Sequence, residues 1–230
     1  MRIKGLRIDF LIRLRIFLLT LVIILSSSAC HKSKEPSGSD TTSHSFVWTA
    51  DTIGTYFSSL RDVWGTDVNN VYAVGYIVLS DSPYTYTAIM HWDGTQWTSS
   101  NYQDGTLDGI YGFSANDIWV VGEVPLAGSP YELISHWDGR KWNSTEFNQY
   151  GPLTKIWGTN SSSVNAVGLG GLILYYDGHS WNQQQSGTSL DLRSVWGIDD
   201  SHVYAVVTRI TVMGSCFNQM ASLGKLLPSE

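Results

Sequence analysis

The sequence predicts an all-β protein built from a repeated four-stranded unit, and three short patterns that recur in the same order carry this prediction. The first pattern, Leu-x-x-Val/Ile-Trp/Tyr-Gly, stands at 60–65, 107–112, 153–158 and 192–197. The second is an apolar run such as "VYAVG", found at 71–75, 118–122, 164–168 and 203–207. The third, Asp-Gly-x-x-Trp, closes three of the units, at 93–97, 138–142 and 177–181.

Each unit has the composition of strands joined by turns. The repeat period is 47, 46 and then 39 residues, counted between Trp64, Tyr111, Trp157 and Trp196. Runs rich in Val, Ile, Trp and Tyr alternate with clusters of Gly, Asn, Asp and Ser, which is typical of short strands. We expect four strands per unit, namely "LRDVWG", "VYAVG", "TAIMHW" and "QWTSS" in the first. Asp-Gly suits the last hairpin turn, because glycine adopts positive φ freely and aspartate bonds nearby backbone.

Units of four strands and roughly 40–50 residues are typical of the blades of a β-propeller. We therefore predict propeller repeats over 46–207, about 3.5 to 4 blades in all. The expected blades lie near 60–101, 107–147 and 153–185, with a partial blade at 192–207. The "VWG", "AVG" and "DG-x-x-W" elements resemble the Asp-box/BNR class of bacterial propellers, and within it the photosystem II assembly-factor-like propellers. This resemblance implies the same propeller fold.

The two ends of the repeat region leave the number of blades open. Trp48 is expected on a fourth strand whose first three are missing, and residues 208–230 form a divergent tail without the pattern. In one explanation, "RITVMG" (209–214) is a third strand, and the Trp48 strand completes the last blade and closes a four-bladed ring. In the other, the chain is a truncated or frameshifted part of a larger propeller. Closure matters because open blades leave unpaired strand edges.

Residues 1–30 are predicted to be a bacterial secretory signal. A basic leader precedes the apolar run 16–25, which is shorter than the roughly 20 residues that a membrane-spanning helix needs. The "SSSA" that precedes Cys30 resembles the lipobox of bacterial lipoproteins, which implies that Cys30 becomes a lipidated N-terminus. An ordinary secretory signal and an uncleaved anchor are the alternatives. Residues 31–45 have no apolar side chain for a core, so we expect a flexible tether there.

The cysteines and the charge limit the classes of structure and partner. A lipidated Cys30 could not pair with Cys216, the other cysteine, so no disulfide framework is expected. The leader holds five of the 14 basic and one of the 20 acidic residues, which leaves nine basic and 19 acidic residues and a net charge of −10. Nucleic-acid binding depends on clustered Lys and Arg. Nucleic acid is therefore not an expected partner.

Repetition argues that the conspicuous polar and aromatic residues are structural. The histidines His91 and His136 occupy equivalent positions, and Tyr175 fills the same position in the third unit. A general base or metal ligand is not usually duplicated in this way. The repeated aspartates are interpreted as turn formers, and these are Asp93, Asp138 and Asp177. All ten tryptophans fall on repeat positions and are expected to pack between blades. We expect no catalytic residue, no metal and no cofactor.

The segments that break the repeat are the candidate binding surface. The connections 76–86 and 123–132 are long, share "SPY", and carry Tyr84, Tyr86 and Tyr131. Exposed tyrosine suits peptide or glycan contact, and propellers bind through loops on one face. The plainer interpretation is that both connections are decorated turns.

Together these features favour a non-catalytic binding or assembly module, lipid-anchored at the bacterial cell envelope, on the outer membrane or its periplasmic face. Its partner would be a protein or a glycan. The alternative is a glycan-active enzyme or a fragment of one. A sialidase needs an arginine cluster, whereas the chain after the leader has Arg61, Arg140, Arg193 and Arg209 at scattered or repeat positions. A compact cluster of acids and arginines at the ring centre would favour the enzyme.

Overall fold

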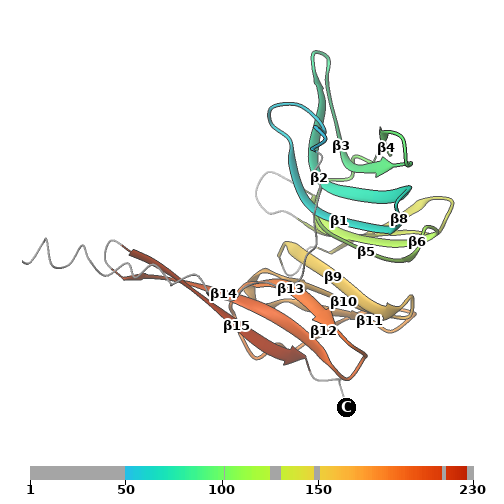
Figure 1. Cartoon of the computed structure of the whole chain (residues 1–230). Helices are drawn as coiled ribbons and strands as arrows, with labels where there is room; N and C mark the ends of the chain where they lie inside the picture. The colour runs from blue at the N-terminus through green and yellow to red at the C-terminus, as the bar shows by residue number, and fades with distance from the viewer. Residues whose placement is uncertain (1–49, 101, 125–130, 148–150, 214–215, 227–230) are drawn as a thin grey trace, which may run out of the picture. The chain divides into compact units, whose positions relative to one another are not determined.

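The computed structural model describes residues 50–226, apart from 101, 125–130, 148–150 and 214–215. The described strands form three four-stranded antiparallel sheets and one three-stranded antiparallel sheet, and each sheet is made of consecutive strands (Figure 1). The predicted all-β fold of β-propeller blades is confirmed. Within the described residues, no helix is both long enough and apolar enough to cross a membrane.

The first two sheets follow the same plan. Sheet 1 contains β1 (Ser59–Asp67), β2 (Asn70–Asp81), β3 (Tyr84–Trp92) and β4 (Trp97–Ser99). Sheet 2 contains β5 (Thr106–Ser114), β6 (Asp117–Val124), β7 (Tyr131–Trp137) and β8 (Trp142–Phe147). In both sheets the strands pair in chain order, so every connection is a hairpin.

Sheets 3 and 4 complete the series. Sheet 3 contains β9 (Leu153–Asn160), β10 (Ser163–Gly168), β11 (Ile173–Tyr176) and β12 (Trp181–Gln184), and the 3-10 turn η1 (Leu169–Gly171) joins its two middle strands. Sheet 4 contains β13 (Leu192–Gly197), β14 (Val203–Met213) and β15 (Cys216–Leu226).

The last sheet differs from what the sequence suggested. In the four-bladed explanation the "RITVMG" segment supplies a third strand, but its first five residues lengthen β14 instead. The third strand is β15, which pairs with β14 along its whole length, from Met213 opposite Cys216 to Val203 opposite Leu226. The run of Thr, Ile and Val in 208–213 favours continued strand over a turn, which accounts for the difference. The predicted strand around Trp48 lies outside the described residues.

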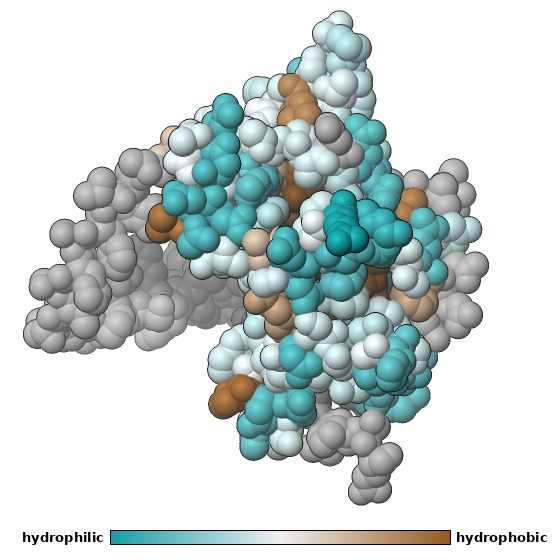
Figure 2. Space-filling model, turned by 90° about the vertical axis from the view of Figure 1, so that its right-hand side faces the viewer, coloured by the Kyte–Doolittle hydropathy of each residue, from teal (hydrophilic) through white to brown (hydrophobic). Residues whose placement is uncertain are grey.

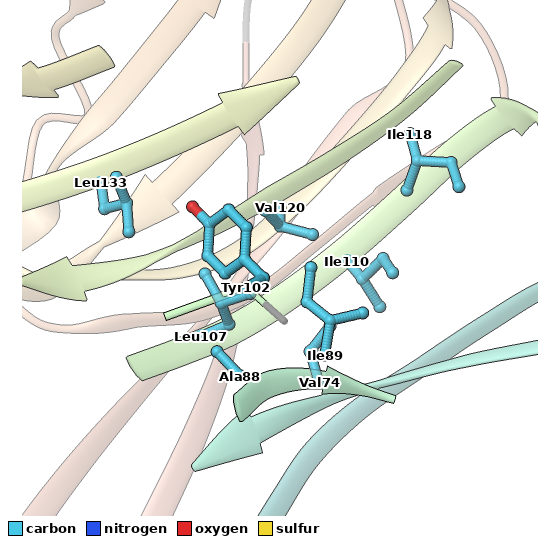
Figure 3. Close-up of a cluster of buried hydrophobic side chains, with 9 residues drawn as sticks. All are labelled: Val74, Ala88, Ile89, Tyr102, Leu107, Ile110, Ile118, Val120 and Leu133. Carbon is cyan, nitrogen blue, oxygen red and sulfur yellow. The ribbon is translucent and has the colours of Figure 1, made fainter. Parts of the chain in front are cut away.

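The hydrophobic core lies between successive sheets rather than within any one of them. On the face drawn in Figure 2 the surface is mostly hydrophilic, and the apolar side chains there form small separate patches. Figure 3 shows the first of the cores, in which Val74, Ala88 and Ile89 of sheet 1 face the side chains of sheet 2. The first strand of the following sheet supplies two buried side chains to each core, and these are Leu107 and Ile110, Leu153 and Ile156, and Leu192 and Val195. The Leu-x-x-Val/Ile part of the repeat therefore encodes packing between blades.

The aromatic-glycine pair of the same motif has a matching role. A Cβ atom placed on Gly112 of sheet 2 would lie 2.6 Å from the indole ring of Trp64 in sheet 1. The same distance separates a Cβ on Gly197 from the ring of Trp157, and a Cβ on Gly158 would lie 2.9 Å from the ring of Phe113. Real carbon atoms do not approach this closely. Glycine is thus required because an aromatic ring of the preceding sheet lies against its backbone.

Candidate functional site

The Asp-Gly turns are closed by the aspartate side chains. Asp93 Oδ1 accepts hydrogen bonds from the backbone N–H of Thr95 at 2.8 Å and of Gln96 at 2.9 Å, and from the hydroxyl of Thr95 at 2.6 Å. Asp138 and Asp177 accept from the backbone N–H groups at the same two following positions. Glycine follows each aspartate with a positive φ of 85° to 93°. These three carboxylates hold turns and point at their own backbone.

Hydrogen bonding to the ionised form lowers the pKa of all three aspartates. The Thr95 hydroxyl and the backbone N–H groups of Gln96 and Thr95 lower the pKa of Asp93 to about 2. The N–H of Lys141, the amide of Asn143 and the N–H of Arg140 lower the pKa of Asp138 to about 2. The pKa of Asp177 is lowered through the N–H groups of Ser180 and His179. Such carboxylates stay ionised and are poor general acids near neutral pH.

The two repeated histidines connect neighbouring strands within their sheets. The ring of His91 stacks on Tyr72 with centroids 4.4 Å apart, and its Nε2 lies 2.7 Å from Asn70 Oδ1. The ring of His136 stacks on Trp119 at 4.0 Å, and its Nε2 lies 2.8 Å from Asp117 Oδ1. In sheet 3, the hydroxyl of Tyr175 lies 3.3 Å from Ser163 Oγ, at the equivalent position on the neighbouring strand. Each of these side chains links the third strand of its sheet to the second.

The connection 76–86 was expected to be a loop, but most of it is a β-hairpin. Strand β2 continues to Asp81 and β3 begins at Tyr84, which leaves a two-residue turn. Runs of Tyr, Ile, Val and Thr favour strand here. Pairing with β1 ends where Ser59 lies opposite Tyr76, so the hairpin extends beyond the rest of its sheet (Figure 1). The chain just before β1 joins its edge, because Thr55 N donates to Val78 O at 2.7 Å.

Three tyrosines gather on this hairpin. The rings of Tyr76 and Tyr86 stack with centroids 5.4 Å apart, and the ring of Tyr84 lies 6.2 Å from that of Tyr86. The hydroxyls of Tyr76 and Tyr84 are hydrogen-bonded to each other, and this bond raises the pKa of Tyr84 to about 12. The Tyr86 hydroxyl donates to Gln103 O at 3.2 Å. We call Tyr76, Tyr84 and Tyr86 the tyrosine cluster, and Tyr84, 54% exposed, is its most accessible member.

The third candidate tyrosine lies apart from this cluster. Tyr131 begins β7, stands opposite Val124 and is half-buried. Among the described residues, its ring has no contact with the rings of the tyrosine cluster, so the structure brings Tyr84 and Tyr86 together but not Tyr131. Tyr76 was missed because it precedes "SPY" by several residues. Its position could have been found only by recognising that 76–86 folds back as a hairpin.

The structure also brings together charged residues that the sequence analysis did not group. Lys155 Nζ on β9 lies 2.5 Å from Asp62 Oδ2 on β1, which also accepts from the backbone N–H of Ile110 at 2.8 Å. Arg61 on β1 forms an ion pair with Asp108 on β5. These residues follow the Leu of the first-strand motif in three different units. We call Arg61, Asp62, Asp108 and Lys155 the inner-strand charge cluster. Arg61 and Asp108 occupy equivalent repeat positions with opposite charge, and so do Asp62 and Lys155. This change of sign between units was the signal in the sequence that could have indicated the ion pairs.

Within the inner-strand charge cluster, every named charge has a partner of opposite sign. Burial raises the pKa of Asp108 above its usual range, although the hydrogen bond from Arg61 acts in the opposite direction. Across the parts of the chain that the structure describes, no group of three or more His, Cys, Asp or Glu side chains comes together in a way that could hold a metal ion. Cys30, the predicted lipidation site, lies outside the described residues.

Comparison with known proteins finds similarity to solved structures. No protein-family model and no curated protein sequence matches the chain. The solved structure described as "YCF48 bound to D1 peptide" aligns with a TM-score of 0.47 and 16% sequence identity. The alignment covers 74% of this chain and 52% of the other, so this chain spans about half the length of that one.

Proposed function

We propose that this chain is a non-catalytic binding module in which the tyrosine cluster contacts a protein or glycan partner. The observation that carries the proposal is the accessible, mutually packed set of rings on a hairpin that extends beyond its sheet. Tyrosine provides a large contact area at low entropic cost, and its hydroxyl adds polar contacts, which makes it common in binding surfaces. The stacking of Tyr76 on Tyr86 holds these rings in place before a partner arrives.

The same proposal includes a location. A lipidated Cys30 would attach the chain to the bacterial cell envelope, at the outer membrane or its periplasmic face, and residues 31–45 would serve as the tether. The support is the order of basic leader, apolar run and small residues before Cys30. Radiolabelled palmitate incorporation tests the anchor, with Cys30→Ser as the control that should lose the label.

The glycan-active enzyme has weaker support. Glycoside hydrolysis needs two carboxyl groups free to act across the scissile bond. In the inner-strand charge cluster, Asp62 is bonded to Lys155 and to a backbone N–H, and Asp108 is paired with Arg61. Both carboxylates therefore join one sheet to another. The chain is better suited to bind than to hydrolyse.

Alanine substitution of the cluster tests the binding role. The whole chain would be screened against an array of peptides from envelope proteins and an array of bacterial cell-wall glycans, which separates the two partner classes. For the ligands that bind, we expect Tyr84→Ala to weaken affinity about ten-fold or more, as for residues at the centre of an interface. Tyr84→Phe keeps the ring and should retain most of the affinity, and Tyr131→Ala should have little effect.

The folded state of each variant would be checked by thermal unfolding. Tyr84 is exposed, so its replacement should leave the unfolding midpoint within about 2 °C of the original. Wild-type affinity in a folded Tyr84→Ala, Tyr86→Ala double variant would reject the tyrosine cluster as the binding surface.

A further inference from the structure

The three contacts between neighbouring sheets share one design. The leading sheet offers an aromatic side chain in or directly after its first-strand motif, which is Trp64, Phe113 or Trp157, and the following sheet offers a glycine with two apolar side chains. Trp157 of sheet 3, for example, packs on Gly197 of sheet 4, and it shares a core with Leu192 and Val195. In the interior of the series both partners are covered. Trp157 is only 6% exposed, and the two apolar residues beside Gly197 are buried.

The first sheet presents the receiving half of this contact to solvent. Its equivalent residues are Leu60, Val63 and Gly65, which we call the receiving face. Leu60 is 49% and Val63 is 63% exposed, whereas their six counterparts in sheets 2 to 4 are all buried. Gly65 is exposed, although the three equivalent glycines are buried. The difference arises because no described sheet precedes β1.

The last sheet presents the other half. Trp196 of β13 is equivalent to Trp157 but is 60% exposed, and Ile198, two residues later, is 71% exposed. The counterparts of this pair in sheet 2, Tyr111 and Phe113, pack against each other and join the core formed with sheet 3. We call Trp196 and Ile198 the inserting face. In repeat proteins the outer faces of terminal repeats are ordinarily polar, which makes these two apolar faces notable.

We propose that a second copy of this chain covers these faces, with the inserting face of one copy packed on the receiving face of the other. Three of the four first-strand aromatics, Trp64, Tyr111 and Trp157, already pack within the chain. Trp196 is the fourth. Within the described residues it has no glycine of a following sheet to pack on, and Gly65 is the equivalent glycine that is exposed. Both faces are exposed in the same chain, so they do not cover each other. A second copy supplies the missing half of each contact.

The association is head-to-tail, because the two faces differ. A contact of this kind closes into a ring if the rotation between copies allows, and otherwise extends into a chain of copies. In either case each contact repeats the aromatic-on-glycine packing found between the sheets. The proposal concerns self-association and stands independently of the binding role of the tyrosine cluster.

Co-isolation of two differently tagged copies of the full chain, expressed together, tests this proposal. Val63→Glu places a charge on the receiving face, and Trp196→Glu removes the aromatic ring of the inserting face. Wild-type copies should co-isolate. Two copies that both carry Val63→Glu, or both carry Trp196→Glu, should lose at least 90% of the co-isolated signal. One copy of each variant should restore it, since one intact contact remains between them.

Gln96→Glu is the matched control for Val63→Glu. It adds the same charge to sheet 1 in the exposed turn after β3, which is two strands from β1 in the order of the sheet, and co-isolation should be unchanged. The restored signal of the mixed pair shows that both variants fold, so a loss in the matched pairs reports the contact itself. Wild-type copies that fail to co-isolate would overturn the proposal, and so would variant pairs that co-isolate as well as wild type.

Discussion

At the scale of the residue, the role of each polar side chain follows from its position in the repeat. Asp93 looks reactive beside His91 and Trp92, but its carboxylate bonds the backbone of the turn that comes after it. His91 bonds Asn70 and stacks on Tyr72. The same interactions return in the next unit, where Asp138 and His136 replace them. Chemistry at a single site would not need such copies, so these side chains are part of how the blade is built.

Replacing Asp93 separates the role of its acceptor oxygen from that of its charge. All three hydrogen bonds of Asp93 in the turn are accepted by Oδ1, so Asp93→Asn can keep them, whereas Asp93→Ala removes them. We expect Asp93→Ala to lower the thermal midpoint by about 2–4 °C for a domain of this size, and Asp93→Asn to lower it less. Equal losses in the two variants, measured by circular dichroism, would show that the acceptor is unimportant.

The charge of Asp93 predicts a pH dependence. Its pKa is lowered to about 2 in the folded protein, so its contribution is present above the unfolded pKa of about 4 and is lost as pH falls toward 2. The stability difference between wild type and Asp93→Asn should therefore shrink as pH falls from about 5 to 2. Urea midpoints of both proteins across this range measure it. A constant difference would contradict the lowered pKa.

At the scale of the element, packing takes place between pairs of neighbouring sheets. A sheet supplies its aromatic ring to the next sheet and receives the ring of the previous one on its glycine, as Gly112 receives Trp64. Its first-strand Leu and Val or Ile complete the core between them. The β2–β3 hairpin is different, because it continues past β1 and carries the tyrosine cluster away from these cores. The first strands, which pack against neighbouring sheets, are repeated in every unit, whereas the β2–β3 hairpin, which is proposed to bind the partner, is not repeated.

Gly112→Ala should disturb the contact between sheets 1 and 2. The added Cβ would lie 2.6 Å from the Trp64 ring, and overpacking of this kind costs about 1–3 kcal/mol. Trp64→Leu creates space at the same place, so the double variant should be more stable than the sum of the two single losses predicts. Denaturant unfolding of the four proteins forms the cycle. Additive losses would mean that the ring and the glycine are not in contact.

At the scale of the whole molecule, the sheets are joined by polar contacts as well as by the hydrophobic cores between them. Lys155 of sheet 3 reaches Asp62 of sheet 1, which in turn accepts the N–H of Ile110 in sheet 2. Thr154 donates to the backbone of Leu192 at 2.6 Å and so joins sheet 3 to sheet 4. These contacts lie along the first strands. The repeat leaves the two positions after Leu free to vary, and the chain uses them for pairing between sheets.

Lys155→Met should destabilise the chain, because it leaves the largely buried carboxylate of Asp62 without its cation. We expect a loss of about 1–3 kcal/mol in the free energy of unfolding. Arg193→Met is the control, since the ion pair of Arg193 with Asp191 is exposed and should contribute less than about 1 kcal/mol. Urea unfolding measures both. A larger effect of Arg193→Met would indicate that the Lys155 contact does not join the sheets.

The sequence by itself determined the fold class, the four-stranded unit and the Asp-Gly hairpin, because strand alternation and turn chemistry depend on residues close together in the chain. Tertiary structure decided the rest. The ion pair of Asp62 with Lys155 joins residues 93 positions apart, and the packing of Trp64 on Gly112 crosses between units. The tyrosine cluster needed the fold-back of 76–86, and Trp196 is exposed because no described sheet packs on it. The local residue pattern specifies each strand, whereas a contact between blades joins residues far apart in the sequence and therefore depends on which blades are neighbours in the folded chain.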